Sequence, residues 1–138
     1  MNPSEVALTL EQAKRLAELD PKHFNLFGPC FYFDMPEGIE VDLAAFREDG
    51  TPIEMARYVL HQSAMYRWML SQMADRWNYL KERSSKPSTR VPSCRVEYNA
   101  MLPAMKSEGH QLASESGSKI ILESYIAYLE ARSAGGSK

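Results

Sequence analysis

Residues Thr51 to Arg83 read TPIEMARYVLHQSAMYRWMLSQMADRWNYLKER, and they contain the strongest helix signals of the chain. The stretch opens with Thr51-Pro52-Ile53-Glu54, a capping hydroxyl, a proline and a glutamate, which favour a helix start. After Pro52 the stretch contains neither glycine nor proline. We therefore predict one continuous helix over residues 52–83, which at about 1.5 Å per residue would span roughly 45 Å.

One side of this predicted helix is apolar at coiled-coil spacing. Apolar residues recur at steps of four and three residues, or multiples of these steps: Met55, Val59, Tyr66, Met69, Met73 and Leu80. Ile53, Leu60, Trp68 and Trp77 widen this side beyond the seam. Because one partner helix would leave part of so wide a surface uncovered, we predict a homo-oligomer with the seam residues at its interface. Core packing within one chain is the competing interpretation of the methionines.

The second half of the chain predicts a further helical arm. Residues 84–93 are rich in serine and contain two prolines, which is typical of a loop. A helical segment is expected over residues 93–132, although Gly109 and Ser116-Gly117-Ser118 weaken it. The sequence leaves open whether this segment is one helix or two. Two long helical arms joined by a short loop predict a helical hairpin.

A shorter helix and a β-hairpin precede the long helix. Thr9 and Gln12 have the spacing of a capping box, and apolar residues continue at helical spacing as far as Leu19. Residues 24–50 combine a run of aromatic residues with an alternation of apolar and acidic residues over Ile39 to Leu43, which is typical of strands. We predict a two-stranded β-hairpin in this segment.

Together these elements predict a single domain of residues 1–138 in the mainly α class. Its scaffold would be a long antiparallel helical hairpin over residues 51–133, preceded within residues 1–50 by a short N-terminal helix and a small β-hairpin. Residues 134–138 are expected to form a flexible tail.

The net charge of −2 conceals an uneven distribution of charge. Residues 1–52 carry ten acidic and four basic residues, a balance of −6. Residues 53–95 carry three acidic and eight basic residues, a balance of +5. The two segments either neutralise each other within the fold or face different partners.

The sequence gives no pattern for catalysis or metal binding. His23, His61 and His110 are far apart and belong to no metal-ligand spacing, and neither Cys30 nor Cys94 has a matched base. No phosphate-binding glycine loop, serine elbow or dinucleotide fingerprint is present. We therefore predict a protein that is not an enzyme and that uses no cofactor or metal.

Membrane insertion and secretion are not expected. Apolar runs such as Ile120-Ile121-Leu122 are too short to span a bilayer, and residues 1–5 lack the regions of a secretory signal. We expect a cytoplasmic protein that has no membrane partner.

A basic segment over residues 81–95 is the first candidate binding site. Cations and hydroxyls alternate in it, and these groups bind phosphate oxygens; the predicted nucleic-acid or anion ligands are Lys81, Arg83, Lys86, Arg90 and Arg95, with Trp77 as a platform for base stacking. A solvated loop that only keeps the hairpin tip soluble is the competing interpretation.

Two functions follow from these features. The first is a non-enzymatic, oligomeric, helical binding protein that contacts nucleic acid or another polyanion through residues 81–95. Helical hairpins with basic tips occur among phage-encoded accessory proteins, although no motif ties this chain to them. The alternative is a protein–protein adaptor or inhibitor that docks through the acidic and aromatic residues 24–50, for example on a basic nucleic-acid-binding protein.

Overall fold

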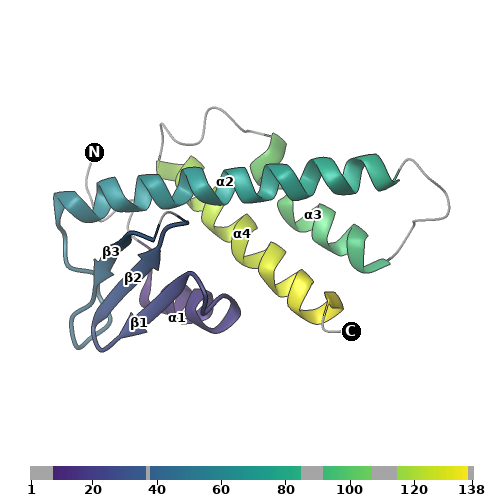
Figure 1. Cartoon of the computed structure of the whole chain (residues 1–138). Coiled ribbons are helices and arrows are strands. Elements are labelled where there is room, and N and C mark those ends of the chain that lie inside the picture. Colours follow the sequence, from purple (N-terminus) through teal and green to yellow (C-terminus); the bar gives the residue numbers. More distant parts are fainter. Residues whose placement is uncertain (1–7, 37, 85–91, 107–114, 137–138) are drawn as a thin grey trace. The chain divides into compact units, whose positions relative to one another are not determined.

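The computed structural model describes residues 8–36, 38–84, 92–106 and 115–136 (Figure 1). Within these ranges the chain forms four helices and one three-stranded antiparallel sheet: α1 (Leu10–Leu19), β1 (Phe24–Phe27), β2 (Cys30–Asp34), β3 (Glu40–Ala45), α2 (Ala56–Ser84), α3 (Pro92–Lys106) and α4 (Glu115–Gly136). The fold is therefore mixed α/β, and the predicted mainly α fold with a long helical hairpin is wrong.

The sheet has three strands because Gly28 and Pro29 form a tight turn. Gly28 has φ +62°, a conformation that L side chains rarely adopt, and Phe27 pairs directly with Cys30 across the turn. Phe24–Phe27 is consequently a strand of its own. The two-stranded β-hairpin predicted within residues 24–50 did not include this third strand.

The predicted second arm is two helices. Helix α3 ends at Lys106, and α4 begins at Glu115 and continues through Gly117 to Gly136, beyond the predicted start of the tail. The backbones of α3 and α4 pack closely on each other, whereas α2 meets them through side chains, for example Trp68 against Tyr125 at 5.7 Å between ring centroids. Gly109, the other predicted weak point, lies outside the described residues.

The chain divides into two compact units, Met1–Met65 and Tyr66–Lys138. Helix α2 contributes residues 56–65 to the first unit and residues 66–84 to the second. No helix within the described residues is long and apolar enough to cross a membrane.

In the first unit, the predicted helix α1 and its capping box are confirmed. The Thr9 hydroxyl accepts a hydrogen bond from the Gln12 backbone N–H at 3.1 Å, and the Gln12 side chain accepts one from the Thr9 backbone N–H at 2.9 Å. Ala13 and Leu16 are buried, and α1 packs next to β1.

One face of the sheet forms the core of this unit. The strand order is β1-β2-β3, and Phe24 stands opposite Phe33. The Phe24 ring stacks on Phe31 and Phe33 with centroid distances of 5.9 and 5.2 Å, and all three rings are buried. Burial of this magnitude stabilises by about 2–3 kcal/mol for each aromatic side chain.

The start of α2 is joined to strand β3. The pairing shifts between Phe31 and Tyr32, so that Leu43 has no partner on β2. Its carbonyl accepts a hydrogen bond of 2.7 Å from the buried Gln62 side chain, and His61 Nδ1 lies 2.7 Å from the Asp42 carbonyl. Two side chains of α2 therefore satisfy backbone oxygens of β3.

The long helix itself is confirmed, but it begins at Ala56 instead of residue 52. The predicted start signal is used elsewhere: Pro52 forms an isolated bridge with Phe46, and the Ile53 N–H donates to the Ala45 carbonyl at 2.8 Å. The Thr51 hydroxyl donates to Asp49 at 2.6 Å. Because this segment pairs with residues beside β3, it is not helical, and α2 begins about one turn later than predicted.

The second unit is built on packed methionine and aromatic side chains. Buried side chains come from all three of its helices: Met69, Met73 and Leu80 of α2, Met101 and Met105 of α3, and Ile121, Leu122 and Tyr125 of α4. Methionine suits such a core because its flexible side chain fills irregular gaps.

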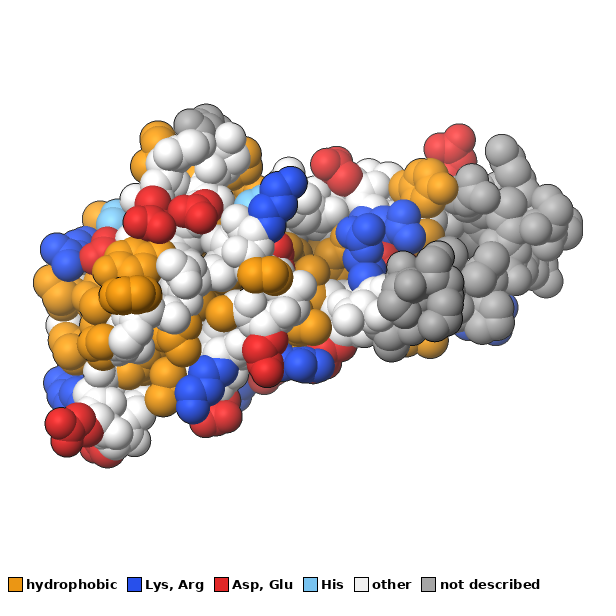
Figure 2. Space-filling view, turned by 60° about the horizontal axis from the view of Figure 1, so that its bottom comes forward, with side chains coloured by type: hydrophobic (Ala, Val, Ile, Leu, Met, Phe, Trp, Pro, Cys, Tyr) orange, Lys and Arg blue, Asp and Glu red, His pale blue; other side chains and the backbone are white. Residues whose placement is uncertain are grey.

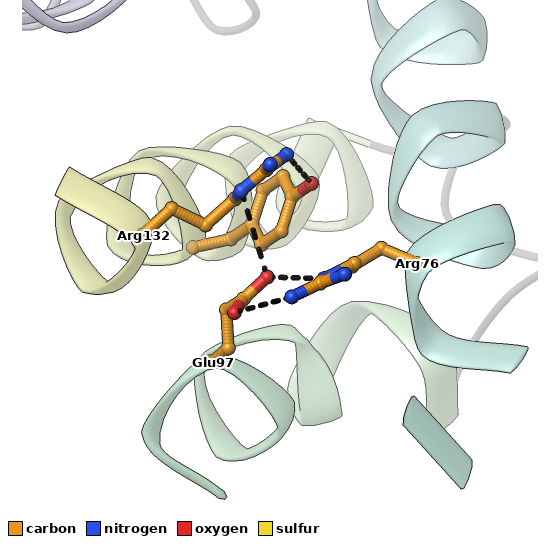
Figure 3. A network of polar contacts seen from close by, with 4 residues as sticks. Arg76, Glu97 and Arg132 are labelled. Atoms are coloured by element: carbon orange, nitrogen blue, oxygen red, sulfur yellow. Dashed lines mark hydrogen bonds and ion pairs between the residues drawn. The ribbon is translucent and has the colours of Figure 1, made fainter. Parts of the chain in front are cut away.

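A buried carboxylate connects these three helices. Glu97 of α3, whose side chain is 6% exposed, accepts two hydrogen bonds from Arg76 of α2, one of them at 3.0 Å between Nη2 and Oε2. Arg132 of α4 lies 3.7 Å from the same carboxylate and donates to the Tyr128 hydroxyl at 2.9 Å. Figure 3 shows Glu97 between the two arginines.

We predict that Glu97→Gln destabilises the second unit. Removing the carboxylate charge leaves Arg76 and Arg132 uncompensated, and because both are partly exposed we expect a loss of about 2 kcal/mol, below the value for a fully buried pair. Urea unfolding followed by tryptophan fluorescence measures this, since Trp68 and Trp77, the two tryptophans of the chain, lie in this unit. The exposed Glu123→Gln is the control and should change stability by less than about 0.5 kcal/mol. Equal stability of the two variants would show that the Glu97 carboxylate does not stabilise the second unit.

Candidate functional site

The described part of the predicted basic site consists of two exposed cations, Lys81 and Arg95. The side chains of Arg83, Lys86 and Arg90 lie outside the described residues. Trp77 stacks on Tyr98, with 4.0 Å between ring centroids and 13° between planes. One face of the proposed stacking platform is therefore covered by the chain's own tyrosine.

The predicted oligomer seam is largely part of the core. Tyr66, Met69, Met73 and Leu80 are each at most 3% exposed within the chain itself. Met55 precedes the helix and is 37% exposed, and Val59 is half-buried. The sequence prediction assumed one partner helix, whereas α3 and α4 both cover this side of α2. Oligomerisation itself stays a prediction, but these four buried residues do not offer a surface for it.

The side of the sheet opposite the aromatic core is a more promising site. Side chains alternate along a strand, so residues paired across strands share a face. Ala45, which pairs with Cys30 on this face, is buried. The other residues of this face are exposed or half-buried, and we call them the open face: Asn25 and Phe27 of β1, Cys30, Tyr32 and Asp34 of β2, and Glu40 and Asp42 of β3.

One end of the open face is apolar. Phe27 is 74% exposed and stands opposite Cys30 next to the Gly28-Pro29 turn. Ile53, 37% exposed, lies at the same end because its backbone N–H bonds to Ala45, the partner of Cys30. Figure 2 shows hydrophobic side chains gathered on the left of the view, where the sheet-containing unit lies. Phe27 and Ile53 therefore offer exposed apolar surface at one end of the sheet.

The other end of the open face is acidic. Asp34 stands directly opposite Glu40, and like charges in this position repel each other. Neither carboxylate forms an ion pair with any residue that the structure describes. Asp42, by contrast, is compensated by Arg57 at 2.8 Å and by His61 at 3.2 Å. The repulsion between Asp34 and Glu40 would be relieved by a cation supplied from outside.

Tyr32 connects the two ends. Its pKa is raised above the ordinary value of 10, mainly by Cys30, through a side-chain hydrogen bond and through the charge of the thiolate. The carboxylates of Glu40 and Asp42 add smaller effects in the same direction. The phenol of Tyr32 therefore keeps its proton at pH values at which an ordinary tyrosine would begin to lose it.

The acidic and aromatic character of residues 24–50 is evident from the sequence, but the division of these residues between two faces is not. The signal was present in the alternation Phe31-Tyr32-Phe33-Asp34, in which every second residue belongs to the core. Without Gly28-Pro29 recognised as a turn, the relation of Phe27 to Tyr32 and Asp34 could not be derived. Among the described residues, no group of three or more His, Cys, Asp or Glu side chains is arranged to hold a metal ion.

Comparison with protein-family models, with curated proteins and with solved structures found no match to this chain.

We predict that Cys30→Ala lowers the pKa of Tyr32 towards 10, because the largest cause of its upward shift is removed. A pH titration of tyrosine ring signals by NMR measures the change. Cys94→Ala, at the other cysteine of the chain, should leave the pKa of Tyr32 unchanged. An unaltered Tyr32 titration in Cys30→Ala would show that the two side chains do not interact.

Proposed function

We propose that the protein is a non-enzymatic interaction module that docks a cationic segment of a partner protein on the open face of its sheet. The proposal is supported by Asp34 and Glu40, which face each other without an ion pair to any described residue, on the same face as the exposed Phe27. Neither feature stabilises the fold. Like charges that face each other destabilise the sheet, and an exposed phenylalanine contributes little to the core.

The two ends of the open face would make different contributions to binding. Burial of Phe27 under a partner supplies about 1.5–3 kcal/mol and is the main source of affinity. Exposed ion pairs with Asp34 and Glu40 supply only about 0.2–1 kcal/mol each. Their larger effect is on the rate of association and on the choice between cationic and anionic partners.

The spacing of the two ends defines the partner. Cys30, beside Phe27, and Asp34 are four residues apart on β2, a distance of about 14 Å at 3.4 Å per residue. An extended peptide would match this distance with an apolar side chain and a lysine or arginine four residues apart, both on the same side.

Binding of a polyanion through residues 81–95 is the second proposal. The observation in its favour is that Lys81 and Arg95 are exposed and lie where α2 ends and α3 begins. It is less strongly supported because Trp77 is already stacked on Tyr98.

The test uses a fluorescent peptide with two leucines followed, four residues later, by two lysines, and a matched peptide with glutamates in place of the lysines. We expect the full chain to bind the lysine peptide, with an affinity that falls as salt rises. Phe27→Ala and Asp34→Lys/Glu40→Lys should each weaken binding about tenfold or more, equivalent to about 1.4 kcal/mol.

The matched control is Glu18→Lys/Glu48→Lys, which changes the net charge equally at exposed positions outside the open face. It should keep the affinity within about twofold, as expected for screened distant charges. Equal binding of both peptides, or equal losses in the two double variants, would overturn the proposal. Binding of a DNA duplex that is unaffected by Asp34→Lys/Glu40→Lys would instead support the polyanion proposal.

A further inference from the structure

The two edges of the sheet differ in how their backbone groups are bonded. Along β3, later residues of the chain bond to three carbonyls at 2.7 to 2.8 Å: His61 to that of Asp42, Gln62 to that of Leu43, and the Ile53 N–H to that of Ala45. The edge formed by β3 is therefore covered by the segment that leads into α2 and by the first turns of this helix.

The other edge of the sheet is β1, because the strand order is β1-β2-β3. The Asp34 N–H donates to the His23 carbonyl at 2.8 Å, so the backbone groups of His23 and of every second residue after it face β2. The N–H and C=O of Leu26 consequently face away from the sheet. Among the described residues, none forms a hydrogen bond with them.

Helix α1 crosses the sheet and does not run along this edge. At its start, Leu10 Cδ2 would lie 3.5 Å from a Cβ atom placed on Gly50, in the loop that follows β3. At its end, the Asp20 carbonyl accepts a hydrogen bond of 3.0 Å from the N–H of Phe24, the first residue of β1. The edge of β1 thus stays open over residues 25–27 within the described part of the chain.

The sequence of this edge does not protect it from strand pairing. Edge strands commonly carry charged residues or proline, whereas β1 reads Phe-Asn-Leu-Phe and has neither. Because β1 has only four residues, an added strand gains few hydrogen bonds, and the side chains on the open face still supply most of the affinity.

We propose that the cationic segment of the partner binds as a fourth, antiparallel strand along the free edge of β1. The inference rests on the proposed function and adds the path of the partner's backbone. One residue of the partner, which we call the paired residue, exchanges two hydrogen bonds with Leu26. The residue before it then lies beside Phe27, and the third residue after it lies beside His23, with both side chains on the open face.

This arrangement reproduces the spacing that the open face requires. The two partner residues on the open face are four residues apart, so an apolar side chain meets Phe27 while a cationic one lies at the acidic end. Asp34 pairs with His23 and is therefore two strand spacings, about 10 Å, from the added strand. A lysine or arginine side chain extends towards Asp34 across β1, and Glu40 lies beyond it.

A second copy of β1 fits this edge less well than a cationic segment. The three apolar residues of β1 are followed four residues later by Gly28, Cys30 and Phe31, none of which is a cation. Pairing of two β1 strands would therefore leave the repulsion between Asp34 and Glu40 unrelieved.

Two N-methylated peptides test the proposal on the unaltered full chain. Each contains one leucine and, four residues later, one lysine, in an otherwise threonine sequence with a fluorescent label. Methylation of the residue directly after the leucine, which is the paired residue, removes the N–H that donates to the Leu26 carbonyl and should weaken binding about tenfold or more. Methylation one residue later changes an N–H that faces solvent and should keep the affinity within about twofold.

Leu26→Pro tests the same contact from the other side. Proline is tolerated where the N–H of an edge strand faces solvent, and this substitution leaves the bonds between β1 and β2 in place. It should weaken binding of the unmethylated peptide about tenfold or more, whereas Leu26→Val, which retains the N–H, should bind like the unaltered chain.

Equal binding of the two methylated peptides would overturn this inference. If Phe27→Ala and Asp34→Lys/Glu40→Lys still weaken binding of the unmethylated peptide, the partner lies across the open face, and the proposed function stands. If the unmethylated peptide does not bind the unaltered chain, the proposed function is wrong as well. Self-association without peptide that is lost in Leu26→Pro, measured by sedimentation velocity, would show instead that the edge pairs with a second copy.

Discussion

The alternation of side chains along β1 and β2 is the constraint on which the rest of the first unit depends. The two-residue turn at Gly28-Pro29 fixes the register, so Phe24, Phe31 and Phe33 share one face while Phe27, Tyr32 and Asp34 share the other. A slip of one residue would exchange the two faces, burying an aspartate and exposing two phenylalanines. The large cost of that exchange ensures that the same side chains always face outward.

Carboxylates in the interior and on the open face differ in whether a nearby cation compensates them. Glu97 is nearly buried, and its charge is compensated by Arg76 and Arg132, as the desolvation of a carboxylate requires. On the open face Asp42 is compensated by Arg57, whereas the opposed Asp34 and Glu40 are not compensated within the described residues. The buried Glu97 is thus paired, whereas Asp34 and Glu40 are exposed and have no ion pair among the described residues.

Local signals in the sequence were sufficient for some elements and insufficient for others. The capping box of Thr9 and Gln12 identified the start of α1. The long run without glycine or proline identified most of α2. Both signals depend on residues that are close together in the sequence. The start of α2 was wrong because Pro52 and Ile53 pair with residues beside β3, a contact that propensity does not describe. The seam of α2 was read as an interface because the packing of α3 and α4 over it depends on tertiary structure.

The candidate site was accessible to sequence reasoning only in outline. Composition indicated an acidic and aromatic segment, but the cross-strand position of Asp34 and Glu40 follows from the pairing of β2 with β3, which a single sequence leaves undetermined. Exposure of the aromatic rings to a soluble gadolinium chelate, measured by NMR relaxation in dilute protein at high salt, tests whether the sheet divides its aromatic side chains between a buried and an exposed face. Strong relaxation enhancement at Phe27 and Tyr32 together with protection of Phe24, Phe31 and Phe33 is the predicted result. Protection of Phe27, or enhancement at Phe31 and Phe33 equal to that at Phe27, would contradict the account.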